Sequence, residues 1–138
     1  MGTYDFSHID KLAKQHGVPF KILIVDDEEW MRKVFGEFCS ETDAFDVDLA
    51  VSGSEAVEKM QTASYDLVTL DLIMPEISGL DVLHEIKQMS PHTPVMIVTG
   101  NATDRLVKEA GVLGACRVLY KPVRLEDFIE SLASALER

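Results

Sequence analysis

Residues 21–27 read Lys21-Ile22-Leu23-Ile24-Val25-Asp26-Asp27, an apolar and largely β-branched run that ends in two aspartates. A run of this composition and length predicts a buried strand. Beyond the aspartates, apolar residues recur at the spacing of one helix face, at Trp30, Met31, Val34, Phe35, Phe38 and Cys39. A buried strand followed by an amphipathic helix is the repeating unit of an α/β fold.

The same alternation recurs four more times along the chain. We expect further strands at residues 45–51, 66–70, 95–98 and 116–120, each followed by a segment with helical periodicity. Strands that alternate with helices are joined by crossovers and run parallel. The third and fourth strands are almost wholly apolar, which is typical of a sheet covered on both faces. The pattern therefore predicts an α/β fold, a three-layer sandwich around a five-stranded parallel sheet.

The segment ahead of the first strand predicts a short additional helix over residues 8–16. Ser7 can cap its start and Gly17 can end it, and Ile9 and Leu12 then share its apolar face. A helix of this length is marginal without tertiary contacts. We therefore expect it to pack on the domain or on a second copy of the chain, with disorder as the alternative.

Length and composition indicate one globular domain. The chain has 138 residues, of which 46% are hydrophobic and 27% charged, and a domain of this size has a self-sufficient core. We divide it into an N-terminal extension, residues 1–19, and one domain, residues 20–138. No apolar run approaches the roughly 20 residues that a membrane-spanning helix needs, so we expect no membrane partner.

Charge and cysteine content narrow the expected partners and compartment. Thirteen basic and 24 acidic side chains give a net charge of −11, which argues against direct binding of nucleic acid. Cys39 and Cys116 lie among apolar residues without metal-ligand spacing. We expect both to be buried, reduced thiols, which fits a cytoplasmic protein.

Polar side chains follow four of the five predicted strands. Asp26 and Asp27 follow the first, Asp71 the third, Thr99 the fourth and Lys121 the fifth. Ligands of open α/β sheets bind beyond the carboxyl ends of the strands. Each residue alone is typical of a helix cap or a solvated loop, but three gathered carboxylates repel one another unless a cation or an ammonium lies among them. Carboxylate oxygens suit Mg²⁺, and a lysine suits an arriving phosphoryl group.

These residues, with their neighbours, resemble the response-regulator receiver family of two-component signalling, of the chemotaxis type. The resemblance spans about residues 20 to 137, and motifs in order at four strand ends make it specific. It implies a flavodoxin-like sheet with strand order 2-1-3-4-5. The motifs are Asp26-Asp27, Asp71-Leu72-Ile73-Met74-Pro75 with Gly79, Thr99-Gly100 and Lys121-Pro122.

The resemblance implies a divalent cation, Mg²⁺ or Mn²⁺, at the acidic residues. Its direct ligands would be Asp27, Asp71 and the backbone carbonyl of Ile73. Asp26 would act on the cation through a water molecule. The cation would neutralise charge on the transferred oxygens.

The resemblance also implies that Asp71 is the phosphoacceptor. The donor would be a histidine kinase, a phosphotransfer protein or a small phosphodonor. Lys121 would pair with the acyl phosphate, and the Thr99 hydroxyl would bond a phosphoryl oxygen. Such a domain is a switch and not an enzyme. An output domain or target protein would bind the face formed by the helix after Thr99, the fifth strand and the last helix.

The chain departs from the family pattern at three positions. Val118 stands where the family usually has Tyr or Phe, and Ile73 and Asn101 stand where the side chain influences the lifetime of the phosphoryl group. Tyr120, two positions along the same strand, is an alternative aromatic for the switch, and a fixed packing role is the competing interpretation. The family also implies a cis peptide bond between Lys121 and Pro122.

Two other functions compete with a phosphoacceptor. One is a binding module of the same fold that never takes up phosphate. The other is a metal-dependent phosphohydrolase, which usually places its nucleophile after the first strand with a second Asp two positions on. Here Asp26 and Asp27 are adjacent and Glu28 follows. The sequence leaves open whether the chain acts alone or within a longer regulator, and as a monomer or a homodimer.

Overall fold

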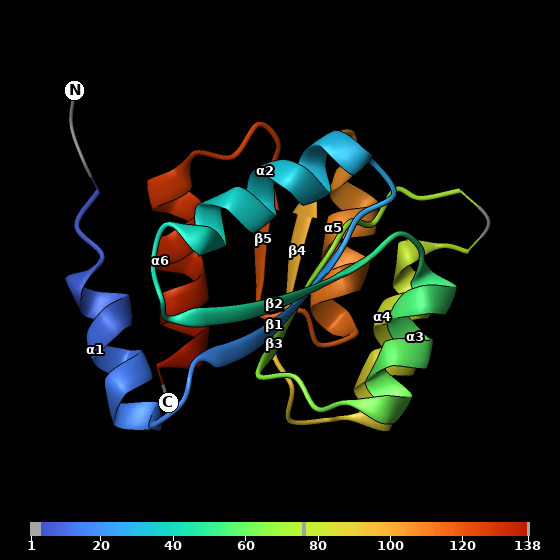
Figure 1. The fold of residues 1–138 in the computed structure, drawn as a ribbon. Coiled ribbons are helices and arrows are strands. Elements are labelled where there is room, and N and C mark those ends of the chain that lie inside the picture. The colour runs from blue at the N-terminus through green and yellow to red at the C-terminus, as the bar shows by residue number, and fades with distance from the viewer. Residues whose placement is uncertain (1–3, 76, 138) are drawn as a thin grey trace.

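The structure is a computed structural model that describes residues 4–75 and 77–137. Strands and helices alternate along this part of the chain (Figure 1). The strands are β1 (Phe20–Val25), β2 (Phe45–Ala50), β3 (Leu67–Leu70), β4 (Val95–Thr99) and β5 (Arg117–Tyr120). The helices are α1 (Ser7–His16), α2 (Glu29–Ser40), α3 (Gly53–Thr62), α4 (Gly79–Met89), α5 (Asp104–Val112) and α6 (Leu125–Leu136).

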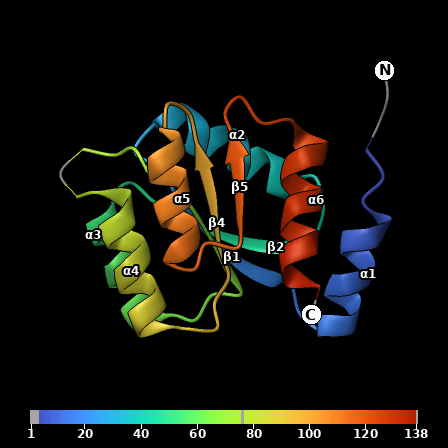
Figure 2. The same ribbon diagram turned by 180° about the vertical axis from the view of Figure 1, so that it is seen from behind.

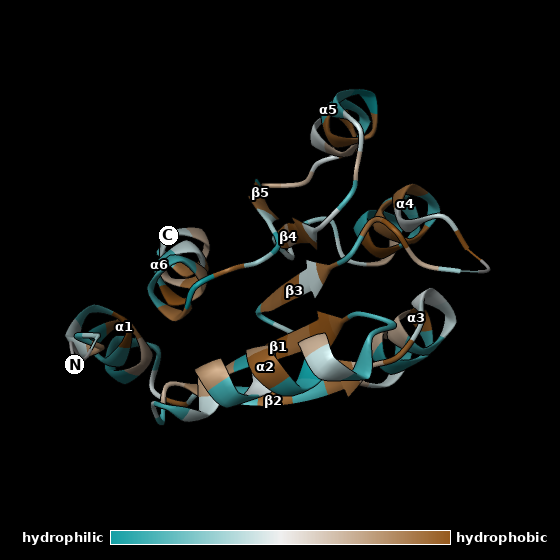
Figure 3. Ribbon diagram, turned by 90° about the horizontal axis from the view of Figure 1, so that it is seen from above, coloured by the Kyte–Doolittle hydropathy of each residue, from teal (hydrophilic) through white to brown (hydrophobic). Residues whose placement is uncertain are grey.

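The strands form one parallel sheet in the order β2-β1-β3-β4-β5. Helices α1, α2 and α6 contribute to the apolar cluster on one face, and α3, α4 and α5 to the cluster on the other. Figures 2 and 3 show the two helical layers on either side of the sheet. The three-layer sandwich, the flavodoxin-like fold and the strand order are therefore confirmed.

The central strands are apolar because both of their faces are covered. In β1, Ile22 and Ile24 belong to the cluster shared with α2 and α6, whereas Leu23 and Val25 belong to the opposite cluster. Every residue of β3 and β4 is buried as well. Side chains alternate between the two faces of a strand, so a continuous apolar run fills both halves of the core. Charged groups are consequently confined to the ends of these strands.

The predicted N-terminal helix is confirmed, and it packs on the domain. It lies beside α6 (Figures 1 and 2), and Ile9 is only 1% exposed within the core cluster of that face. The His16 ring stacks on Phe20 with centroids 4.5 Å apart. Gly17 ends the helix at φ 94°, a left-handed conformation that glycine adopts readily.

Two local expectations were wrong. Ser7 is not the cap of α1 but its first residue, and its N–H donates to the Asp5 carboxylate over 2.9 Å. Cys116 is exposed, because it precedes β5, an edge strand that only β4 pairs. Cys39 is buried as expected. Within the described residues, no helix combines the length and the apolar character that crossing a bilayer requires.

We predict that Ile9→Ala destabilises the whole domain, because the removed carbons fill a core shared with α6. The expected loss in the free energy of unfolding is about 2–5 kcal/mol. Lys11→Ala, on the exposed side of the same helix, is the matched control and should stay within about 0.5 kcal/mol of wild type. Urea unfolding of the three proteins measures both values. Equal stability of the two variants would show that α1 is not part of the cooperative core.

Candidate functional site

The residues expected at the strand ends are brought together at one edge of the sheet. Asp26 and Asp27 follow β1, Asp71 follows β3, Thr99 ends β4 and Lys121 follows β5. Their side chains enter the site because parallel neighbouring strands end side by side, at the edge where ligands of such sheets bind.

Backbone hydrogen bonds continue past the ends of the strands and fix these positions. The Asp71 N–H donates to the carbonyl of Val25 over 3.1 Å, and the Lys121 N–H donates to the carbonyl of Thr99 over 2.8 Å. The backbone of Asp71 and of Lys121 is therefore still held by the neighbouring strand, although both residues lie just past the end of their own strand.

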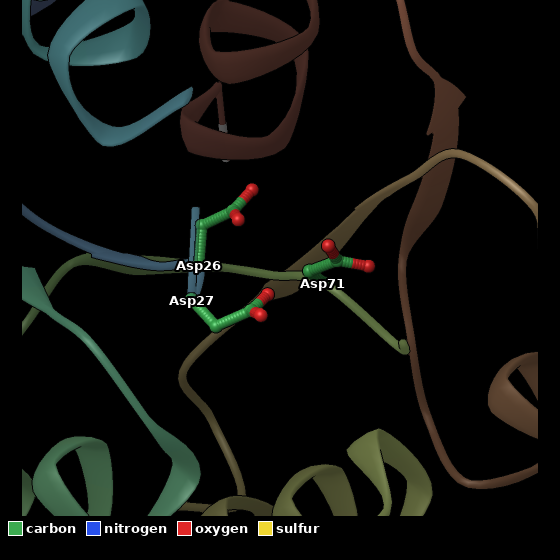
Figure 4. Close-up of side chains that lie close together, drawn as sticks. All are labelled: Asp26, Asp27 and Asp71. Carbon is green, nitrogen blue, oxygen red and sulfur yellow. The ribbon is translucent and has the colours of Figure 1, made fainter. Parts of the chain in front are cut away.

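Three carboxylates lie side by side in this region (Figure 4). Asp26, Asp27 and Asp71 each present an oxygen within 4.8 Å of the others. Asp26 and Asp71 are 2% and 4% exposed, whereas Asp27 is exposed. Burial raises the pKa of the Asp26 carboxyl above its ordinary value, although hydrogen bonds from Lys121 and from the Glu28 amide act in the opposite direction. The cluster is thus shielded from solvent on the side of Asp26 and accessible to solvent at Asp27.

Lys121 lies among carboxylates from two other loops. Its Nζ is 2.8 Å from Asp26 Oδ2, 2.9 Å from Asp71 Oδ2 and 3.0 Å from Glu28 Oε1. The ammonium donates hydrogen bonds to Asp71 and Glu28 and forms an ion pair with Asp26. Burial lowers the pKa of Lys121, but the interactions with the three carboxylates outweigh it, so the pKa is raised. The charge of Lys121 is therefore permanent at physiological pH.

The second oxygen of Asp71 is held from another direction. The fully buried Thr99 hydroxyl donates to Asp71 Oδ1 over 2.9 Å, and the Ile73 N–H donates to the same atom over 3.0 Å. One carboxylate oxygen thus faces a hydroxyl and an amide, and the other faces an ammonium. This arrangement fixes the orientation of the Asp71 carboxylate.

Gly79 allows the loop after Asp71 to return tightly to the start of α4. A Cβ on this glycine would lie 2.4 Å from the Cα and 2.6 Å from the carbonyl oxygen of Leu72. The Gly79 N–H donates to that same carbonyl over 3.2 Å. Only glycine leaves room for this contact, which holds the backbone next to Asp71.

Sequence reasoning missed two residues that contact the site. Glu28 was noted as an acid beside Asp27 but not as a partner of Lys121. The Arg32 guanidinium donates to the backbone carbonyl of Asp26 over 2.7 Å, and its position one turn into the helix after Asp27 was the only available signal. The Lys121–Pro122 peptide bond is cis, as the resemblance implied.

The comparison with known families agrees with this geometry. The model described as "Response regulator receiver domain" matches residues 22–133. The chain belongs to this family. The matched part of this receiver begins within β1 and ends within α6, whereas α1 lies outside the matched residues.

Individual relatives cover most of the receiver. The chemotaxis protein CheY of Treponema pallidum is 33% identical over 126 residues, 90% of this chain and 88% of that protein. The response regulator ArlR of Staphylococcus saprophyticus is 36% identical, and the match covers 86% of this chain but 53% of ArlR. A receiver domain structure from Clostridium thermocellum superposes with a TM-score of 0.79 at 33% identity, covering 86% of this chain and 95% of that one.

We predict that Gly79→Ala destabilises the receiver, because the added methyl group meets backbone and not a flexible side chain. The expected loss is about 1–3 kcal/mol in the free energy of unfolding. Gly36→Ala is the control within a helix, since a Cβ there meets nothing within 4 Å, and it should stabilise by about 0.4–1 kcal/mol. Denaturant titration gives both signs. A neutral Gly79→Ala would mean that the loop after Asp71 can relax without cost.

Proposed function

We propose that this receiver is the phosphoacceptor of a two-component phosphorelay and that Asp71 takes the phosphoryl group. The donor is a histidine kinase, a phosphotransfer protein or a small acyl phosphate. The observation that carries this proposal is the buried Asp71 carboxylate, held by Lys121 and Thr99 beside two further aspartates.

In the proposed reaction a carboxylate oxygen of Asp71 attacks the phosphorus atom. A bond forms between that oxygen and phosphorus, while the bond from phosphorus to the donor breaks and its electron pair leaves with the imidazole or acetate. Lys121 supplies fixed positive charge beside the transferred oxygens. The Thr99 hydroxyl, now bonded to Asp71, is placed to donate to a phosphoryl oxygen.

The residues present fit a divalent cation. The donor set is made of carboxylate oxygens within 4.8 Å of one another, which is the chemistry that Mg²⁺ and Mn²⁺ prefer. We propose Asp27, Asp71 and the Ile73 carbonyl as direct ligands and Asp26 as a ligand through water. When bound, the cation supplies charge that stabilises the transferred phosphoryl group.

The remaining expectations from the sequence belong to the same proposal. We propose that the chain is a switch that turns over no separate substrate, with residues 1–19 as an extension and residues 20–138 as the receiver in a cytoplasmic protein. The partner face is formed by α5, β5 and α6. Tyr120, at the end of β5, is 54% exposed on this edge of the sheet and accessible to a partner.

We predict that incubation with acetyl phosphate and Mg²⁺ adds one phosphoryl group to the protein, because Asp71 is the acceptor. Asp71→Asn should abolish the mass gain, and a chelator should abolish it in the wild type. Asp43→Asn, at an exposed aspartate remote from the site, should be labelled like wild type. Intact-mass spectrometry reads the outcome. Labelling of the Asp71→Asn protein would refute the assignment. Catalytic release of phosphate would indicate a hydrolase, and a wild-type protein that neither gains mass nor releases phosphate would be an inert binding module.

A second prediction concerns cation binding in the absence of a phosphodonor. Trp30 lies in the first turn of α2, three residues after Asp27, so Mg²⁺ or Mn²⁺ should change its fluorescence. Asp27→Ala should weaken cation affinity by roughly tenfold or more, equivalent to about 1.4 kcal/mol, and Asp43→Ala should not. Calorimetry measures the affinity independently of the fluorophore. Unchanged affinity in Asp27→Ala would remove this residue from the proposed ligands.

A further inference from the structure

Glu28 is the third carboxylate on Lys121, and it differs from the other two. The side chains of Asp26 and Asp71 are 2% and 5% exposed, whereas that of Glu28 is 58% exposed. The Glu28 N–H donates to Asp26 Oδ1 over 2.9 Å, so its backbone is fixed by the site. The Glu28 side chain therefore reaches Lys121 from the solvent side.

The Lys121 ammonium is already in contact with three carboxylates, and it donates hydrogen bonds to those of Glu28 and Asp71. Its Nζ lies within 3.0 Å of an oxygen from each of Asp26, Asp71 and Glu28, and an ammonium has only three N–H groups. A phosphoryl group on Asp71 adds a further anion beside this ammonium, so one of the three existing contacts has to be given up. The contact that costs least to break is the solvent-exposed one, because exposed ion pairs contribute little, whereas a buried charge left unpaired is strongly unfavourable.

We propose that Glu28 is a positioning residue that holds Lys121 in the unphosphorylated receiver and releases it to the phosphoryl group. The proposal rests on the function proposed for Asp71. Glu28 competes with the incoming group for the same N–H, and its negative charge also opposes the approach of an anionic donor. Both effects make Glu28 a brake on phosphorylation. Lys121 and Asp71 remain the residues that touch the reacting atoms.

Glu28→Gln removes the charge and weakens the competition while it keeps the length of the side chain. At saturating Mg²⁺, its rate constant for labelling by acetyl phosphate should rise roughly two- to fivefold, the range expected for loss of one exposed ion pair. Glu29→Gln is the matched control, because Glu29 is the adjacent exposed acid and its loss changes net charge equally. It should be labelled at the wild-type rate.

A second readout needs no phosphodonor, because beryllofluoride stands in for the phosphoryl group on Asp71. The side-chain ammonium signal of Lys121 in ¹H–¹⁵N NMR spectra should differ between wild type and Glu28→Gln in the resting protein. It should coincide in the two proteins once Mg²⁺ and beryllofluoride are added, because Glu28 has then released the lysine. A merely structural role of Glu28 would not remove the difference on ligand addition.

The outcomes separate this proposal from the function on which it rests. If wild-type protein takes up no phosphoryl group, the proposed function fails, and with it the brake. If the wild type is labelled but Glu28→Gln and Glu29→Gln react equally fast, or if Glu28→Gln is slower, only the role of Glu28 is overturned. A Lys121 signal that differs between the two proteins equally with and without beryllofluoride overturns it as well.

Discussion

The Lys121 ammonium lies between the carboxylates of Asp26 and Asp71, and the ends of β1, β3 and β5 are arranged around it. Two nearly buried carboxylates this close repel each other and carry a desolvation cost. The ammonium offsets both effects with ion-pair contacts of 2.8 Å to Asp26 and 2.9 Å to Asp71. It comes from the far edge of the sheet, so β4 and β5 have to be paired in register before the carboxylates have their partner. The site therefore depends on the complete sheet.

The core explains why this charge cluster occurs at a strand edge. β3 and β4 are buried along their whole length, with helices on both faces, and leave no place for an unpaired charge within the sheet. At the carboxyl ends of the strands, loops and solvent take the place of the covering helices, and polar side chains can form hydrogen bonds there. The close contact of Gly79 with Leu72 then keeps the loop beside Asp71 short. The body of each central strand thus packs in the apolar core, and its carboxyl end carries the polar residues of the site.

The strands and the set of Asp26, Asp71, Thr99 and Lys121 could be predicted from sequence, because apolar runs locate strand ends and parallel strands bring those ends together. What failed were contacts that depend on how side chains cross between loops. The Glu28–Lys121 contact joins positions 93 residues apart and has no periodic signal. The burial of Cys116 was predicted from its apolar neighbours in the sequence. Its exposure follows from the position of β5 at the edge of the sheet, which local sequence does not reveal.

Helix α1 shows that a family boundary and a folding unit are different things. The family match begins at residue 22, yet Ile9 lies in the same apolar cluster as Phe128 and Leu132 of α6. An alignment identifies what relatives share, whereas cooperativity follows whatever apolar surface a particular chain has covered. A protein trimmed to the aligned residues would expose to solvent the apolar side of α6 that α1 covers in this chain. Such a fragment is expected to be prone to aggregation as well as less stable, so shortened versions of this receiver should retain α1.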